Sequence, residues 1–195
     1  MYHLGLIFPD FLKTFTGQRF KPLNHLNDNN HLNNGAKQHL VRDAHFHNHS
    51  FFHDSCKIIS QIINNSEAKS IPKTFFLSHI ILEIALDRVL MEKDISNLDN
   101  FYKELENVDK QEINIFFKEN KLKNYDLFIQ KLENFTLSRW MYKYLEDKNL
   151  PFSLNRVYFR IGYNQEWNKE QNEALEMALP IILKEIKKAL PSYLD

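Results

Sequence analysis

The chain has 195 residues, of which 43% are apolar and 26% are charged, and this is the composition of an ordinary soluble globular protein. Lysine plus arginine equals aspartate plus glutamate, at 25 each, so no net charge would draw the chain to nucleic acid or to a membrane surface. Only 4 glycines and 6 prolines argue against a turn-rich all-β fold and favour long helices.

Helical spacing of apolar residues recurs along the chain, and no segment shows sustained strand alternation. The last predicted helix, for example, has an apolar face made of Leu175, Ala178, Leu179, Ile182 and Ile186. Asn33 or Asn34 is a candidate cap for the second helix, Ser70 for the fourth (with Pro72 in its first turn), and Asp109 for the sixth. The sequence therefore predicts one all-α domain, a helical bundle over residues 1–195. The predicted elements are a short helix or turn over 5–16 and helices over 35–48, 50–64, 72–92, 98–105, 110–119, 125–147, 151–161 (stopped by Gly162) and 168–190.

Several features predict a cytoplasmic protein. Cys56 is the single cysteine, which excludes an intrachain disulfide and is best interpreted as a packed helix residue. No apolar run approaches the roughly 18 residues that a bilayer-spanning helix needs. The first residues, MYHLGLIFPDFLK, lack a basic stretch followed by a long apolar one, so we expect no signal peptide.

Two segments repeat one pattern, in which a side chain able to bind metal stands at every fourth position three times over. Positions i and i+4 lie on one face of a helix, and i+8 continues the stripe. If the two faces meet, they form a pocket of nitrogen and oxygen ligands. The first stripe is His39, Asp43 and His47, and the second is His79, Glu83 and Asp87.

The first stripe has a competitor in its own segment, because seven of the nine histidines lie between His25 and His53. His45, His49 and His53 share the same spacing on the other side of a helix. We favour the stripe that contains Asp43, since it mixes ligand types, and expect the other three to face solvent or to belong to a break near Asn48. Polar residues on a solvated or capping face remain the alternative for both sets.

The second stripe lies in FFLSHIILEIALDRVLM, a helix that is apolar nearly all round and should be buried. Buried ionisable groups are costly unless they are paired or bound to metal. A salt bridge from Glu83 or Asp87 to Arg88, Arg42 or another basic side chain is the structural alternative.

Mixed imidazole and carboxylate ligands suit Mn²⁺, Fe²⁺ or Zn²⁺ better than Ca²⁺. Asp10, after a proline among apolar residues, is a further ligand candidate, with a helix cap as the alternative. Arg42, Arg88 and Lys13 could hold a phosphate, and Asp43, Arg42 and Arg88 are the predicted catalytic residues. The predicted metal ligands are Asp10, His39, Asp43, His47, His79, Glu83 and Asp87.

Together these motifs resemble the acyl carrier protein phosphodiesterase family. The resemblance is carried by GLIFPDFLK, by G-x-x-x-H-x-x-x-D from Gly35 to Asp43, and by E-x-x-x-D from Glu83 to Asp87. The later W-x-x-x-Y of Trp140 and Tyr144, before a helix ending at Arg160, is also similar to that family. Phe46-His47 stands where the family typically has Thr-Asp.

The resemblance implies an HD-domain-like helical fold and a cytoplasmic enzyme that uses a divalent metal, most often Mn²⁺. The implied reaction removes 4′-phosphopantetheine from the serine of holo-acyl carrier protein, which makes that carrier protein the expected substrate and partner. Two alternatives stay open: a related metallophosphohydrolase acting on a small phosphoester or nucleotide, and a non-catalytic helical binding protein of the same fold.

Overall fold

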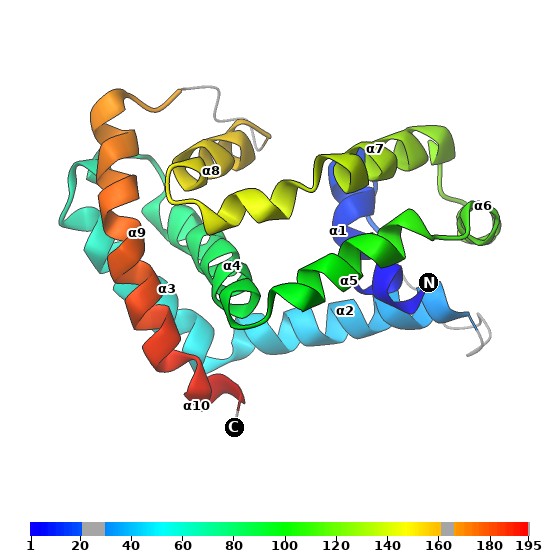
Figure 1. Ribbon diagram of the computed structural model, residues 1–195, viewed down its shortest axis with the longest axis horizontal. Helices are drawn as coiled ribbons and strands as arrows, with labels where there is room; N and C mark the ends of the chain where they lie inside the picture. The colour runs from blue at the N-terminus through cyan, green and yellow to red at the C-terminus, as the bar shows by residue number, and fades with distance from the viewer. Residues whose placement is uncertain (21–29, 161–165, 195) are drawn as a thin grey trace. The chain divides into compact units, whose positions relative to one another are not determined.

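The computed structural model describes residues 1–20, 30–160 and 166–194, and within these ranges every regular element is a helix (Figure 1). The all-α prediction is therefore confirmed. None of the helices in these ranges is both long enough and apolar enough to cross a lipid bilayer.

The chain divides into two compact units, each built from two stretches of sequence. The first comprises residues 1–46 and 96–140, and the second comprises residues 47–95 and 141–195. The single domain over 1–195 stays a prediction. Unit 1 holds α1 (Tyr2–Thr16), most of α2 (His31–Asn48), α5 (Ile95–Glu106), α6 (Lys110–Glu119) and α7 (Tyr125–Ser138). Unit 2 holds α3 (Ser50–Asn64), η1 (Glu67–Ser70), α4 (Thr74–Lys93), most of η2 (Trp140–Leu145), α8 (Asn149–Arg160), α9 (Lys169–Ala189) and α10 (Pro191–Leu194).

Unit 1 is organised around the fully buried ring of Phe8 on α1. The centroid of this ring lies 5.2 Å from the centroids of both Phe116 and Phe128, which come from α6 and α7. Phe20 and Phe117 complete the cluster at 5.8 and 6.0 Å. Edge-on and tilted contacts of this kind add to the free energy gained by burying the rings.

A close crossing of two glycines joins α1 to α2 in unit 1. A Cβ atom built on Gly35 would lie 2.7 Å from the Cα of Gly5, and it would also meet the carbonyl oxygen of Tyr2. A Cβ on Gly5 would lie 2.5 Å from the carbonyl oxygen of Leu32. All of these neighbours are backbone atoms, so the two helices can approach this closely only because both positions lack a side chain.

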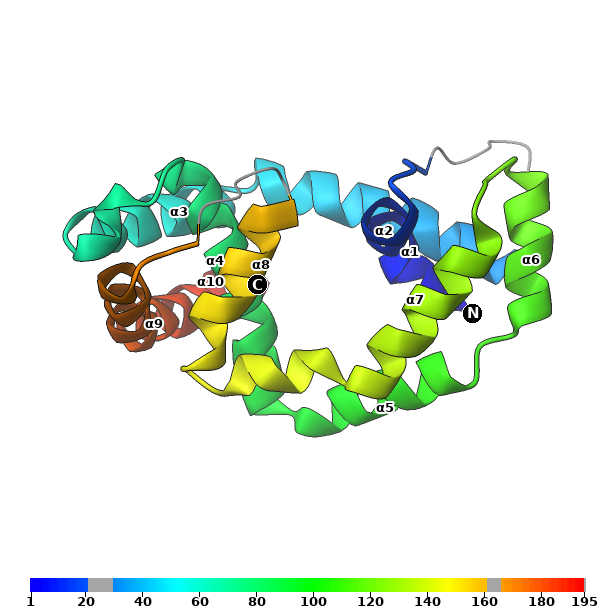
Figure 2. The ribbon, with the colours of Figure 1, turned by 90° about the horizontal axis from the view of Figure 1, so that it is seen from above.

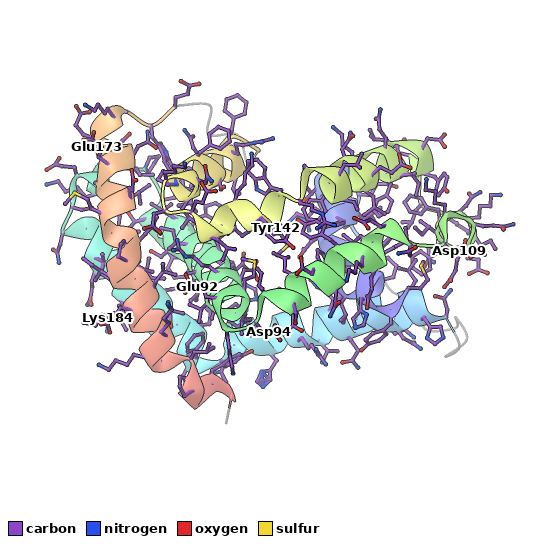
Figure 3. All side chains as sticks on the ribbon, viewed as in Figure 1. Glu92, Asp94, Asp109, Tyr142, Glu173 and Lys184 are labelled. Atoms are coloured by element: carbon purple, nitrogen blue, oxygen red, sulfur yellow. The ribbon has the colours of Figure 1, made fainter. Side chains whose placement is uncertain are left out.

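The core of unit 2 forms where α3, α4 and α9 pack together, as Figures 1 and 2 show. The predicted apolar face of α9 is confirmed as buried. Ion pairs lie over this packing: Glu92 on α4, labelled in Figure 3, accepts from Lys187 of α9 at 2.6 Å and from Arg88 at 2.9 Å. The buried residues of α9 are Leu175, Ala178, Leu179, Ile182, Leu183 and Ile186.

Helix starts are predicted correctly where a local cap is strong. Asp109 accepts hydrogen bonds from the backbone N–H groups of Gln111 and Glu112, as predicted. Asn33 and Asn34 were wrong as caps, because Asn30 accepts from the N–H of Asn33 and the helix already begins at His31.

The start of α4 and the end of α7 also differ from prediction. Lys73 takes the left-handed conformation before α4 begins at Thr74, so Ser70 does not cap that helix and Pro72 lies outside it. The helix predicted over 125–147 breaks at Arg139, where φ is 45°. The predicted stop at Gly162 lies outside the described residues.

The Gly5–Gly35 crossing predicts that Gly35→Ala destabilises the protein although alanine is the better helix former. On an open helix face the substitution would stabilise by about 1 kcal/mol. At Gly35 the added methyl meets backbone atoms, and overpacking of this kind costs about 1–3 kcal/mol. We expect a net loss of up to about 2 kcal/mol in urea unfolding. Gln38→Ala, on the exposed face of α2, is the control, and an unchanged or higher midpoint for Gly35→Ala would contradict the crossing.

Candidate metal centre

The second predicted stripe lies on α4 as expected, and this helix is largely buried. His79 and Glu83 stand one turn apart, with the Nε2 atom of His79 2.9 Å from the Oε1 atom of Glu83. Both side chains are only partly covered, and 43% of the Glu83 side chain stays exposed. The pair therefore stands on a helix that packs into the core, and its side chains are partly open to solvent.

His47, the first residue of unit 2, lies beside this pair. It stands in the last turn of α2, and its Nε2 atom lies 2.9 Å from Nε2 of His79 and 3.7 Å from Oε1 of Glu83. Among the described residues, this His47–His79–Glu83 triad is the one group of three potential ligands whose donor atoms all lie within 4.8 Å of one another.

The spacing of the triad fits a metal ion. Ligand atoms placed tetrahedrally at roughly 2.0–2.1 Å from zinc are about 3.3 Å apart, and the three separations in the triad, 2.9, 2.9 and 3.7 Å, lie on both sides of that value. Two Nε2 atoms in hydrogen-bond contact cannot both carry a proton toward each other, so at least one presents a lone pair. Two imidazoles and one carboxylate are the set found in catalytic zinc and iron sites that keep open positions.

Phe52 on α3 forms one wall of the triad. Its ring centroid lies 4.7 Å from that of His47 and 5.0 Å from that of His79, and Phe52 itself is 4% exposed. A buried aromatic ring that touches both imidazoles restricts their rotation and keeps water from that side. The sequence did not predict the role of Phe52, because no recognisable pattern links it to His47, five residues earlier.

Asp87, one turn beyond Glu83, is partly buried and is not a member of the triad. Burial and the negative charge of Glu83 together raise the pKa of its carboxyl group to about 7. No hydrogen bond or ion pair to this carboxylate occurs among the described residues. A carboxyl group that lies beside another acidic group is stabilised in its charged form by a bound cation.

Cys56 on α3 also lies near Glu83, but its thiol is not a nucleophile. Burial, followed by the charge of Glu83, raises the pKa of this thiol to about 11. The thiol therefore stays protonated at neutral pH in the metal-free protein, because only the thiolate reacts and ligates. This agrees with the prediction that Cys56 is a packed helix residue.

Three predicted ligands, Asp10, His39 and Asp43, belong to unit 1. His39 donates from Nδ1 to the carbonyl oxygen of Leu6 at 2.8 Å, and its Nε2 atom lies 3.7 Å from Oδ2 of Asp10. Asp10 lies inside α1, so the alternative of a helix cap was wrong, and Asp43 is exposed. A single centre that combines these residues with the triad involves both units and stays a prediction.

The predicted phosphate-binding residues differ in their surroundings. Arg42 and Lys13 are exposed. Arg88 is largely covered, and its guanidinium donates to Glu92 and to Asp147, and these two carboxylates raise its pKa. The alternative of a salt bridge from Glu83 or Asp87 to Arg88 was therefore wrong, because Arg88 pairs with Glu92 and Asp147. The basic side chains beside Glu83 are instead those of His79 and His47.

The competing histidines behave as expected. The helix does break after Asn48, and His45 and His53 are exposed. His49 lies in the break itself, where its side chain caps α3.

No family model, curated protein or solved structure matches this chain.

The pKa of Asp87 predicts a pH dependence of stability in metal-free protein. The folded state holds this proton up to about pH 7, whereas the unfolded state releases it near pH 4. The folded state thus binds more protons between these values, so its stability falls as the pH rises from about 4 to about 7. Asp87→Asn should remove this component. The free energy of unfolding of the variant, relative to that of wild type, should therefore rise from about pH 4 to about pH 7, by at most about 1.4 kcal/mol per pH unit.

The measurement is urea unfolding at a series of pH values in the presence of a chelator. Asp54→Asn, an exposed carboxylate on α3, is the matched control and should run parallel to wild type. An Asp87→Asn curve that also runs parallel would contradict the raised pKa.

Proposed function

We propose that this protein is a divalent-metal-dependent hydrolase whose metal is held by His47, His79 and Glu83. The observation that carries the proposal is the convergence of three donor atoms from two helices, with separations of 2.9, 2.9 and 3.7 Å. Three protein ligands leave positions for water and substrate, which is the arrangement of catalytic rather than structural metal sites.

The electrostatics of unit 2 support the same proposal. Asp87 and Glu83 place two acidic groups on one face of a partly buried helix, and burial together with the charge of Glu83 raises the cost of ionising Asp87. Arg88, the nearest cation in sequence, is committed to Glu92 and Asp147. A bound Mn²⁺, Fe²⁺ or Zn²⁺ would supply the missing positive charge.

The proposed reaction is phosphodiester hydrolysis. A divalent cation in this site would lower the pKa of a coordinated water and neutralise phosphodiester oxygens. The imidazoles of His47 and His79, held by Phe52, would orient the site. Asp87, a carboxyl group whose pKa is about 7 without metal, is placed one turn away to exchange a proton with water.

The proposed substrate rests on the sequence resemblance to acyl carrier protein phosphodiesterases. It supports release of 4′-phosphopantetheine from holo-acyl carrier protein by a cytoplasmic protein with an HD-domain-like fold. The further ligands Asp10, His39 and Asp43 and the phosphate contacts Arg42 and Lys13, all in unit 1, stay predictions from the sequence.

Metal binding is the first test. Purified protein should bind Mn²⁺ or Zn²⁺ in calorimetry, and the metal at one hundred times its dissociation constant should stabilise the fold by about 2.7 kcal/mol. His79→Ala and Glu83→Gln should abolish both effects, because each removes one of three ligands. His53→Ala, an exposed histidine on α3, should change neither. Equal binding by His79→Ala and wild type would exclude the triad as the metal site.

Substrate cleavage is the second test. Holo-acyl carrier protein incubated with the protein and Mn²⁺ should lose 4′-phosphopantetheine, as intact-protein mass spectrometry would detect, and Glu83→Gln should be at least about a hundredfold slower. Hydrolysis of nucleotides or small phosphodiesters without any apo-carrier product would favour the related metallophosphohydrolase. Metal binding without turnover of either class would favour the non-catalytic binding protein.

A further inference from the structure

The position of His47 depends on a short junction between two helices. α2 ends at Asn48 and α3 begins at Ser50, so only His49 separates them. His49 has extended backbone angles (φ −79°, ψ 146°), and its Nδ1 atom accepts a hydrogen bond from the N–H of Phe51 at 3.1 Å. A ligand in the last turn of a helix is held only as well as the residues that end that helix, because helix ends fray.

The C-terminal helix α10 holds this junction in unit 2. Tyr193 stacks on Phe51, with ring centroids 5.0 Å apart and an angle of 23° between the rings. The same Tyr193 ring meets the imidazole of His49 edge-on at 5.1 Å. One side chain of α10 therefore contacts the residue that caps α3 and the first buried aromatic residue after it.

We propose that Tyr193 is a positioning residue for the metal centre, and that docking of α10 and binding of the metal are thermodynamically coupled. This inference rests on the proposed metal site. Tyr193 holds His49 and Phe51. These two residues hold the chain that follows His47 against α3, and this keeps the Nε2 atom of His47 beside His79. A catalytic site tolerates displacements of its ligands of only about 0.5 Å, so a loosened junction would weaken binding before it unfolds the protein.

The contacts of Tyr193 with His49 and Phe51 are made by its aromatic ring. Tyr193→Phe should therefore keep the metal affinity of wild type within about twofold. Tyr193→Ala should weaken binding of Zn²⁺ and Mn²⁺ by about tenfold or more, which is the usual effect of removing a residue that orients a ligand. Competition with a chromophoric chelator gives the dissociation constants.

A purely structural role for Tyr193 predicts a different result. Ile186→Val removes one methylene group from the core face of α9 in the same unit and serves as a control for general destabilisation. This variant should lower thermal stability while leaving the dissociation constant unchanged. If Tyr193→Ala does not fold, Tyr193→Leu, which keeps an apolar side chain without a ring, carries the same expectation.

Coupling is reciprocal, so metal should also act on α10. Addition of Zn²⁺ should slow hydrogen exchange of the backbone amides over residues 190–194, and by a similar factor to the affinity lost in Tyr193→Ala. The slowing should be absent in His79→Ala.

The outcomes separate this proposal from the one on which it rests. Wild type that binds metal, with Tyr193→Ala binding equally well, overturns the positioning role and leaves the metal centre intact. Wild type that binds no metal overturns the metal centre and the positioning role with it. Tenfold weaker binding in Tyr193→Ala, with Tyr193→Phe and Ile186→Val unchanged, supports the positioning role.

Discussion

Burial of α4 is the constraint from which the candidate site follows. The apolar residues of this helix, among them Leu77, Ile81 and Ala85, can be removed from water only if the helix packs into unit 2. His79, Glu83 and Asp87 are carried into partial burial with them, because they share the same helix. Their desolvation must be compensated by hydrogen bonds, by countercharges or by a cation, since an isolated buried charge costs several kcal/mol.

The helix shows two solutions to this problem within three turns. Toward its C-terminal end, Arg88 pairs with Glu92 and Asp147, and Lys187 adds a second cation, so the charges there are balanced within the protein. Asp87, which directly precedes Arg88, has no such balance, and burial together with the charge of Glu83 raises its pKa to about 7. Balanced charges, as around Arg88, are typical of a structural ion-pair network. An acidic group without such a balance, as at Asp87, is typical of a site that can receive a cation.

Periodicity predicts most of the helices because a buried stripe leaves a regular mark on the sequence. The predicted apolar face of α9 is correct for this reason. The predicted start of α6 is correct because Asp109 is a strong local cap. The starts of α2 and α4 were wrong, because several Asn and Ser residues are equally suitable caps and tertiary packing decides among them. The left-handed Lys73 before α4 carries no sequence signal at all.

The candidate site shows the same division. The rule of i and i+4 places His79 and Glu83 together, and any helix through these residues would do so. His47 is different, because its contact with His79 depends on the break at His49, on Phe52 and on the packing of α3 against α4. Spacing therefore predicts His39, Asp43 and His47 equally well as ligands, and only the fold of unit 2 brings His47 to the pair on α4. The fold also decides the role of Arg88, the cation next to Asp87 in sequence, because it pairs this side chain with two carboxylates. In the proposed reaction, the positive charge that neutralises a bound phosphodiester must therefore come largely from the metal.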